Sequence, residues 1–349
     1  MFPAYTEISP QRYRETFGLD FEQFQVGQIF QHRPGITVSQ HDNVEESLDT
    51  SNCAQLHYDA HYASQTEFKN CLMVSTLTLQ KLIGSSWKTF ARKERISCFE
   101  EISMISPIFD GDTLYAENEI LETKDLNDVF GELFVEMRGY TQRGDLFTKV
   151  RYRVSIYKSG KHPYYSTLNN GVILDHAKFS AHRLLKNGVL REKTGIFFDD
   201  FSVGEIYEHA PSKFIGKSEA LKHALHALEW NPRYTNPAFS AEYFGEETPP
   251  VMEIYALGAY TTPTTRTLGR VVANLGWHNI KLGRHIYPEE QVYVESEIRD
   301  KKESKSRPTQ GILKVTTRAF DKNHDPLCSF DRTLLVYREN GGPYNQAGY

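Results

Sequence analysis

Residues 21–30 read FEQFQVGQIF, and residues 198–207 read FDDFSVGEIY. The two stretches share a Phe, an acidic residue, a second Phe, a Val-Gly pair and an Ile followed by an aromatic residue, at an offset of 177 positions (198 minus 21). Further on, residues 108–120 (IFDGDTLYAENEI) resemble residues 286–298 (IYPEEQVYVESEI), at an offset of 178 (286 minus 108). Similarity at a fixed spacing indicates that one structural unit occurs twice.

The length of 349 residues is typical of two domains. We expect an N-terminal domain over residues 1–160, a linker over 161–194 that contains one short helix, and a C-terminal domain over 195–349. These domains are called repeat one and repeat two below. The tail ENGGPYNQAGY is rich in Gly and Asn, which predicts a loose end.

Each repeat shows the same order of predicted elements. The stretches SQHDNVEESLDTSN (39–52) and SEALKHALHALEW (218–230) predict a helix. The segments LMVSTLTLQKLIGSSW (72–87) and PVMEIYALGAYTTPTTRTL (250–268) predict a second helix, buried and apolar nearly all round. Segments of alternating polarity follow and predict three or four antiparallel strands. This is an α+β pattern in which the sheet wraps the helix.

The composition excludes several classes of function. The chain has 40 Lys and Arg against 45 Asp and Glu, a net charge of −5, which argues against a dedicated nucleic-acid binder. No apolar stretch reaches the ~18 residues of a membrane span, and the first residues lack the apolar region of a secretory signal. The cysteines form no CxxC pair, which predicts reduced, mostly buried thiols and neither a metal site nor disulfides. We expect a cytoplasmic protein without nucleic-acid or membrane partners.

The loop before the buried helix of repeat one contains chemically capable side chains. It reads NCAQLHYDAHYASQTEFKNCLMVS over residues 52–75 and contains Asn52, His57, Asp59 and Ser75. A His transfers protons near neutral pH, and the N–H groups at the start of a helix stabilise an oxyanion. From these residues alone, a solvated His-rich loop remains the alternative.

The order of these residues resembles that of the MaoC-like hydratases, the R-specific enoyl-CoA hydratases. Their motif is Asp-x-Asn-Pro-Leu-His-x-Asp-x-x-Phe-Ala, with a Gly at the start of the central helix eighteen residues after the His. Matched without gaps, Asn52 falls on the family's catalytic Asp, His57 on its catalytic His, Asp59 on the following acid and Ser75 on the oxyanion-hole Gly. FDGDTLYAE (109–117) also matches the family's Gly-Asp-Thr-Leu strand.

Repeat two resembles the same motif without its imidazole. Residues 229–239 read EWNPRYTNPAF, where Glu229 occupies the acid position and Tyr234 the His position. Over most of the chain, the sequence is similar to that of the tandem mesaconyl-CoA (2-methylfumaryl-CoA) hydratases. Residues 52–57 (NCAQLH) resemble their Asn-x-x-Arg-x-His pattern with Gln55 in place of Arg, and ANLGWHNIKLG (273–283) resembles a run in their other repeat. The order of the His-bearing and degenerate repeats is reversed here.

The resemblance implies a double hotdog, a covalent pseudo-dimer in which an antiparallel sheet curls around one long helix in each repeat. It also implies that the two sheets pair into one, and that the thioester arm of the substrate lies between the repeats. The implied reaction adds or removes water across the double bond of a short enoyl-CoA, whose acyl group can be branched or dicarboxylic. The CoA thioester is the substrate, and no cofactor is implied.

The resemblance assigns a role to each residue of the motif. His57 transfers the proton, alone or with Asp59, and the N–H of Ser75 polarises the thioester carbonyl. Asn52 only orients the water, because an amide has no useful proton affinity. The cationic groups expected to meet the CoA phosphates follow the buried helices: Arg92, Lys93, Arg95, Arg266 and Arg270.

Other interpretations stay open at this point. In these interpretations, Asp59 caps a short turn and Asn52 forms a turn. Glu229 is then a surface acid, and Tyr234 packs at the repeat interface. A hotdog thioesterase is a second function, with Glu253 near the start of the buried helix of repeat two activating water. A non-catalytic acyl-thioester-binding subunit is a third. The substrate is carried on CoA or on an acyl-carrier protein, and homo-oligomers are compatible with the sequence.

Overall fold

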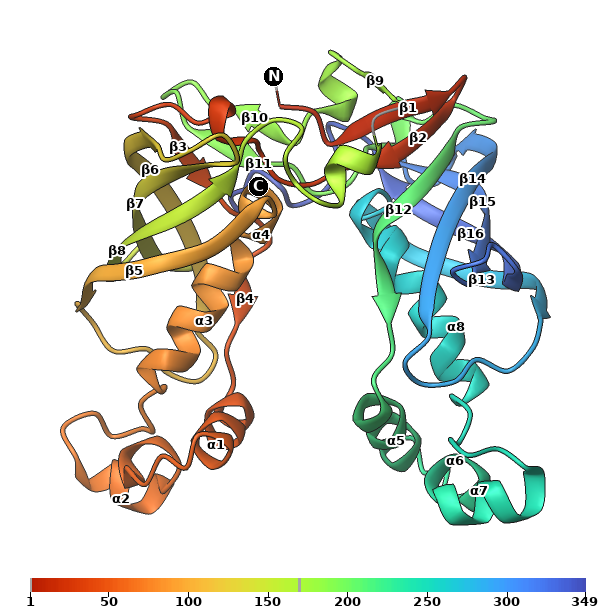
Figure 1. The fold of residues 1–349 in the computed structure, drawn as a ribbon, viewed down its shortest axis with the longest axis horizontal. Helices are drawn as coiled ribbons and strands as arrows, with labels where there is room; N and C mark the ends of the chain where they lie inside the picture. The colour runs from red at the N-terminus through yellow and green to blue at the C-terminus, as the bar shows by residue number, and fades with distance from the viewer. Residues whose placement is uncertain (1, 169–170) are drawn as a thin grey trace.

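A computed structural model describes residues 2–168 and 171–349. It contains two lobes, and each has a curved sheet with a helix against its concave side (Figure 1). The fold is therefore the predicted α+β double hotdog. The two sheets have eight strands each and remain separate, so the expectation that they pair into one sheet is wrong.

The sheet of repeat one runs in the order β10-β11-β3-β6-β7-β8-β5, with β4 paired to β6. Its strands are β3 (Ile29–Gln31), β4 (Ile36–Thr37), β5 (Lys93–Met104), β6 (Thr113–Asp125), β7 (Phe130–Thr141) and β8 (Leu146–Tyr157). The central helix α3 (Ser75–Ser85) is followed by α4 (Trp87–Phe90). The strands β6, β7 and β8 alternate in burial as predicted, and their inner side chains form one core with Leu77 and Leu82 of α3. The strand β5 is mostly exposed and adds only the partly buried Ile96.

Repeat two builds its sheet in the order β13-β16-β15-β14-β12-β2-β1-β9. Its own strands are β12 (Ile206–Phe214), β13 (Val271–Leu282), β14 (Gln291–Glu303), β15 (Gln310–Phe320) and β16 (Pro326–Tyr337). The central helix α8 (Glu253–Thr261) continues into the 3-10 helix η6 (Thr262–Arg266). In both repeats, three long strands form an antiparallel meander, and the long strand that precedes them in the sequence pairs with the last of the three.

Both central helices have an exposed side. In α3, Leu77, Thr78 and Leu82 are buried, whereas Ser75, Thr76 and Gln80 are exposed. In α8, Ala256, Ala259 and Tyr260 are buried, but Ile254 is 67% exposed. The prediction of helices apolar nearly all round was wrong, because the sheet covers only one side of each helix.

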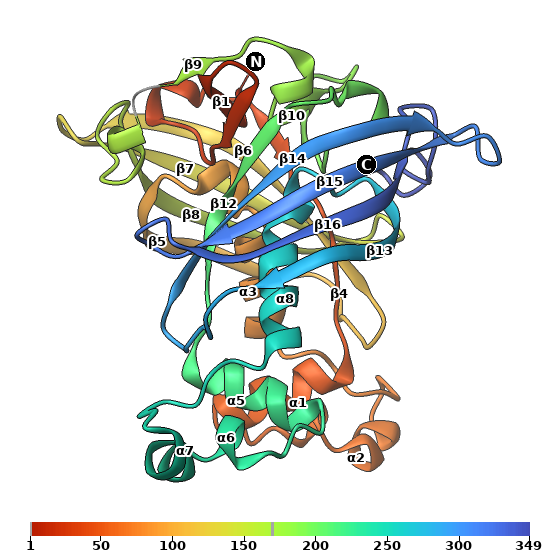
Figure 2. The same cartoon turned by 90° about the vertical axis from the view of Figure 1, so that its right-hand side faces the viewer.

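A group of helices, called the arm below, extends from each lobe away from its sheet (Figures 1 and 2). In repeat one it consists of α1 (Gln40–Asp49), η2 (Gln55–His57) and α2 (Ala60–Gln65), and in repeat two of α5 (Lys217–His226), α6 (Pro232–Thr235) and α7 (Pro237–Phe244). The arms lie next to each other, and an exposed ion pair between Lys222 and Glu45, 3.6 Å apart, joins α5 to α1. The predicted first helices therefore stand outside the sheets and carry the loops of the candidate site.

The repeats exchange their first hairpins. The hairpin of β1 (Tyr5–Ser9) and β2 (Arg12–Glu15) adds to the sheet of repeat two, where β2 pairs in parallel with β12. The hairpin of β10 (His182–Leu184) and β11 (Leu190–Glu192) adds to the sheet of repeat one, where β11 pairs in parallel with β3. Figure 1 shows the red N-terminal hairpin beside β12 in the lobe that is otherwise cyan and blue.

The segments predicted as linker and tail both contact the rest of the fold. The segment 161–194, where one short helix was expected, holds β9 (Val172–Ile173), β10 and β11 with two short 3-10 helices, η3 (Tyr165–Leu168) and η4 (Ala177–Phe179). The tail is anchored, since Arg270 lies 3.8 Å from the centre of the Tyr344 ring and Arg33 donates to the Gly348 carbonyl. Our domain boundaries at residues 160 and 195 remain a proposal. Edge strands from each side of these boundaries pair with the sheet on the other side.

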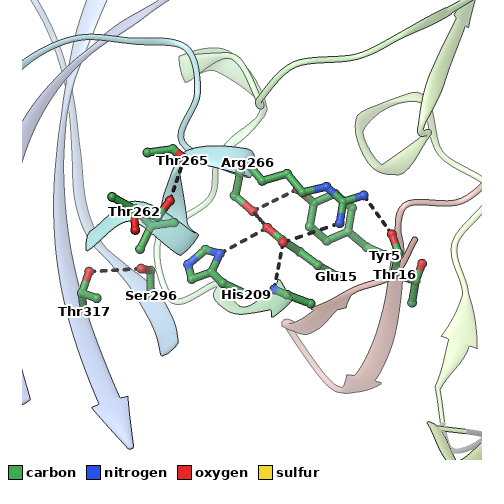
Figure 3. Close-up of polar contacts among 12 residues, drawn as sticks. Tyr5, Glu15, Thr16, His209, Thr262, Thr265, Arg266, Ser296 and Thr317 are labelled. Carbon is green, nitrogen blue, oxygen red and sulfur yellow. Dashed lines mark hydrogen bonds and ion pairs between the residues drawn. The ribbon is translucent and has the colours of Figure 1, made fainter. Parts of the chain in front are cut away.

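Each exchanged hairpin is fixed by a buried carboxylate. Glu15 of β2 accepts a hydrogen bond from the backbone N–H of Ala210 and lies 3.2 Å from Nδ1 of His209, with Arg266 beside it (Figure 3). Burial alone would raise the pKa of Glu15, but the hydrogen bond with His209 and the charge of Arg266 hold it below the ordinary value. The carboxylate therefore stays charged at the joint between the repeats.

The second hairpin repeats this arrangement. Glu192 of β11 lies 2.9 Å from Nδ1 of His32, accepts from the N–H of Arg33 at 3.0 Å and pairs with Lys88 at 3.1 Å. Thr89 donates to the same carboxylate at 2.8 Å. Each carboxylate lies on an exchanged hairpin and binds a His beside the strand that the hairpin joins, His209 on β12 and His32 directly after β3. We call these two clusters the hairpin locks.

All four cysteines are free thiols: Cys71 and Cys328 are buried, and Cys53 and Cys98 are exposed. Only half of the thiols are therefore buried, fewer than predicted. Within the part of the chain that the structure describes, none of the helices combines the length and apolar character needed to cross a membrane.

Candidate active site

His57 ends the short 3-10 helix η2, between α1 and α2, and is half-buried. Its Nδ1 lies 2.7 Å from the carbonyl oxygen of Leu72. Because a carbonyl only accepts, Nδ1 carries the proton of the neutral ring, and Nε2 is left with a free lone pair. The backbone therefore fixes the tautomer that makes Nε2 the basic nitrogen.

Asn43 holds the His57 loop against the central helix. Its side chain is fully buried on α1, and Nδ2 donates to the carbonyl oxygens of His57 at 2.7 Å and Leu72 at 3.1 Å. Its Oδ1 accepts from the N–H of Val74, the residue before α3, at 2.8 Å. One amide thus positions three segments of the site.

The sequence analysis did not single out Asn43. It reads as one polar residue among several in a surface helix. The available signal was the comparison of repeats, since Ala220 replaces Asn43 in repeat two at the same offset of 177 that relates residues 21 and 198. The hydrogen bonds made by the Asn43 side chain therefore occur only in the repeat that carries His57.

Ser75 is the first residue of α3 and is exposed. The N–H groups of a first helical turn have no acceptor within the helix and carry the positive end of its dipole. The hydrogen bond from His57 to Leu72 places the imidazole loop against the segment that leads into this turn. A proton-transfer group and an oxyanion-stabilising helix end are therefore adjacent along the folded chain.

The two remaining predicted residues make local contacts. The Oδ1 of Asn52 accepts from the N–H of Ala54 at 3.0 Å, as in a turn. The Oδ1 of Asp59 accepts from the N–H of Tyr62 at 2.9 Å and caps α2. Among residues 2–168, no hydrogen bond joins Asn52 or Asp59 to the His57 ring. A catalytic role for these two residues remains a prediction.

In repeat two, the equivalent positions contact each other directly. Tyr234 takes the place of His57, and Glu253 takes the place of Ser75 as first residue of the central helix. The Tyr234 hydroxyl lies 3.0 and 2.9 Å from the two carboxylate oxygens of Glu253. Burial and this hydrogen bond raise the pKa of Tyr234 to about 12, so the phenol stays protonated. The Glu229 carboxylate accepts from the N–H of Asn231 at 3.2 Å.

Most of the predicted phosphate-binding cations are engaged inside the protein. Arg92 binds Asp20 at 2.6 Å, Arg266 donates to the carbonyl of Thr16, and Arg270 is buried. Burial lowers the pKa of Lys93. Arg95 is exposed, with Glu94 3.4 Å away. A phosphate contact by this set remains a prediction, and Arg95 is its most accessible member.

Several cavities lie away from His57. The two largest of them, of about 580 and 420 Å³, are lined by residues of β6, β7 and the C-terminal tail and by residues of β13 and β16. One of about 40 Å³ lies between the hairpins, beside Tyr5, His182 and Arg266. Others, of about 300 and 240 Å³, lie in repeat two on the two sides of the Tyr234–Glu253 pair. None of these five is lined by His57, so the cleft expected between that ring and repeat two is not among them.

Clusters of three or more His, Cys, Asp or Glu side chains arranged to hold a metal ion are absent from residues 2–168 and 171–349.

Comparison with known proteins gives a match in the second half. Residues 175–345, just under half of the chain, match the family model described as mesaconyl-CoA hydratase. The curated mesaconyl-CoA hydratase of Cereibacter sphaeroides is 27% identical over 157 residues, which cover 43% of this chain and 44% of that protein. The chain thus aligns with less than half of this relative. The resemblance predicted from the sequence is confirmed.

Solved structures with similar folds span either both repeats or one. A putative MaoC domain protein dehydratase from Chloroflexus aurantiacus covers 93% of this chain and 98% of its own, at 17% identity and a TM-score of 0.40. A conserved hypothetical protein from Mycobacterium tuberculosis with a double hotdog fold covers 92% and 98%, at 16% identity and a TM-score of 0.38. The R-hydratase PhaJ1 from Pseudomonas aeruginosa covers 41% and 88%, at 18% identity and a TM-score of 0.35.

Proposed function

We propose that the protein is a hydro-lyase that adds water to, or removes it from, the double bond of a short enoyl thioester. The observation that carries this proposal is the fixed tautomer of His57, whose Nδ1 is held by the carbonyl of Leu72, three residues before α3 begins, so that Nε2 keeps its lone pair. The family match of residues 175–345 supports a mesaconyl-CoA-like substrate, a short branched dicarboxylic acyl group.

In the hydration direction, Nε2 of His57 accepts a proton from water as the water oxygen bonds to the β-carbon. The electrons of the double bond move toward the thioester, and negative charge develops on its carbonyl oxygen. The imidazolium then returns a proton to the α-carbon, which restores the neutral ring. Such acid–base help contributes roughly 10²–10⁴-fold to a rate.

The N–H at Ser75 receives the thioester oxygen in this proposal. A helix N-terminus is suited to that charge, and removing one oxyanion donor typically costs ~2.7–4 kcal/mol. Asn52 orients the water through its amide without taking the proton. Asp59 keeps the role of a helix cap, since its carboxylate is held by the N–H of Tyr62.

The test compares two histidines of the same loop. His57→Ala is expected to lower the hydration rate of mesaconyl-CoA or crotonyl-CoA by roughly 10²–10⁴-fold, at an unchanged melting temperature. His61→Ala is the matched control, because His61 is exposed four residues later on α2. Loss of the enoyl-thioester absorbance measures the rate. A His57→Ala enzyme that keeps more than about a tenth of the wild-type rate would exclude His57 as the catalyst.

We further propose CoA as the carrier of the acyl group and the cytoplasm as the location, in line with the net charge of −5 and the free thiols. Parallel assays with the same acyl group on CoA and on an acyl-carrier protein distinguish the two carriers.

A further inference from the structure

Repeat two carries a second group of polar side chains that the proposed hydration does not use. Its centre is the Glu253 carboxylate, which accepts from the Tyr234 hydroxyl through both oxygens. Nδ1 of His285, in the loop after β13, lies 3.5 Å from Oε1 of Glu253. Arg233 donates to Nε2 of His285 at 3.3 Å, so the ring proton is on Nδ1 and faces the carboxylate.

This group is accessible to a ligand. The Glu253 side chain is 42% exposed and that of His285 is 37% exposed. Glu253 and His285 line a cavity of about 240 Å³, together with Ala256 and Tyr260 on successive turns of α8. The carboxylate is therefore in contact with a space that water and a small reacting group can enter.

A second cavity, of about 300 Å³, lies on the other side of the Tyr234–Glu253 hydrogen bond. Its wall holds as many polar residues as apolar ones, and the polar residues are Lys217, Ser218, Tyr234, Thr235, Glu247 and Thr248. The apolar residues are Ala220, Leu221, Pro237, Pro249, Pro250 and Pro288. A volume of about 300 Å³ is at the small end of ligand pockets, which suits a short acyl chain.

We propose that repeat two is a second catalytic site, in which Glu253 activates water for the hydrolysis of a short-chain acyl thioester. The acyl chain lies in the proline-lined cavity, and its carbonyl carbon reaches the carboxylate at the Tyr234–Glu253 pair. Tyr234 and His285 are positioning residues, because they hold the carboxylate from two sides. This proposal takes only the substrate class, an acyl thioester, from the proposed function.

The reaction balances without any further reactant. Glu253 accepts a proton from water as the water oxygen bonds to the carbonyl carbon and forms a tetrahedral intermediate. The carbon–sulfur bond then breaks, and the departing thiolate takes the proton back from Glu253. The products are one carboxylic acid and one thiol, and the carboxylate returns to its starting state.

Three variants test the proposed role of Glu253. Glu253→Gln removes the base but keeps an oxygen that accepts from Tyr234, and Glu253→Asp keeps a carboxylate. Glu242→Gln on α7 is the matched control, since Glu242 is exposed in the same repeat. Thiol release from butyryl-CoA and p-nitrophenolate release from p-nitrophenyl butyrate measure hydrolysis in the full-length protein. The ester probe reports on repeat two even if the protein hydrates no enoyl-CoA.

We expect wild type and Glu242→Gln to hydrolyse both probes, and Glu253→Gln to lose about 100-fold or more of that rate at an unchanged melting temperature. Glu253→Asp should recover part of it. In His57→Ala, hydrolysis should persist while hydration is lost. The proposal is overturned if wild type releases no thiol above the buffer rate, if Glu253→Gln hydrolyses at the wild-type rate, or if His57→Ala loses both activities. Loss of hydration instead of hydrolysis in Glu253→Gln would also overturn it.

Discussion

Glu192→Gln tests how strongly the exchanged hairpin of repeat two is held to repeat one. Glu192 is buried, and its carboxylate contacts His32, the N–H of Arg33, Thr89 and Lys88 within 3.1 Å. The substitution keeps the size of the side chain but removes its charge and one acceptor. An NH₂ group then faces donors that previously had a carboxylate oxygen.

The expected loss is about 3 kcal/mol at pH 7, the lower end of the range for a buried pair that loses one partner. The lower end applies because Lys88 keeps a hydrogen bond to the carbonyl of Arg33. An unfolding entropy of about 2.1 cal/mol/K per residue gives about 0.7 kcal/mol/K for 349 residues, so the melting temperature should fall by about 4 °C.

The loss should depend on pH. Burial alone would raise the pKa of Glu192, but the charges of Lys88 and His32 hold it well below its usual range in the folded protein. A depressed folded pKa stabilises the protein above the unfolded carboxylate pKa of about 4.3, and this stabilisation is lost as the pH falls below that value. The difference between wild type and Glu192→Gln should therefore be full at pH 6–7 and narrow below about pH 4.

Scanning calorimetry at several pH values measures this difference. Exposed Glu242→Gln is the control and should stay within about 0.5 kcal/mol of wild type. If Glu192→Gln melts within about 1 °C of wild type at pH 7, the lock contributes little and the reasoning fails. A loss that is the same at pH 4 and pH 7 would show that packing, and not charge, holds the hairpin.

Two further predictions concern residues that differ between the repeats. Burial lowers the pKa of His182 to about 4, so wild type should lose about 2 kcal/mol between pH 7 and pH 5 as the unfolded imidazole gains a proton. His182→Tyr introduces at this position the residue type found at Tyr5, its equivalent in the other repeat. It should remove the pH dependence of stability measured by urea unfolding, and an unchanged pH dependence would assign the effect to another group. Asn43→Ala removes three hydrogen bonds and should cost about 2–3 kcal/mol of stability. It should also lower kcat for hydration more than it raises KM, whereas the exposed control Gln65→Ala on α2 should change neither.

The duplication and the class of fold were predictable because they depend on local patterns. The Phe, Gly and aromatic positions around residues 21–30 and 198–207 recur, and the strands β6 and β14 alternate in polarity. These signals survive divergence, since the recurring aromatic positions pack against the core of each lobe.

The hairpin exchange could not be predicted in this way. β2 could pair with β3 of its own repeat or with β12 of the other, because both strands offer an equivalent edge. The choice depends on contacts between distant residues, such as Glu15 with His209. Residues that are polar and far apart in the sequence give no sign that they will be buried together.

The candidate site was predicted in part. His57 and Ser75 could be found because their spacing follows a recognisable motif. Asn43 could be found only by comparing the repeats, because a buried amide and an exposed one look alike in a helical sequence. Tyr234 was expected to pack at the repeat interface. It instead binds Glu253 within its own repeat, a pairing between residues on separate helices.

The exchanged hairpins also determine how the protein would be dismantled by an unfolding machine. A motor that pulls from the N-terminal side extracts β1 and β2 first, and these strands belong to the sheet of repeat two. The edge of β12 and His209, which loses its partner Glu15, are then exposed while the four long strands of repeat one are still intact. Unfolding from the N-terminus therefore begins in the sheet of repeat two. A ligand bound to repeat two would slow degradation that starts at the N-terminus.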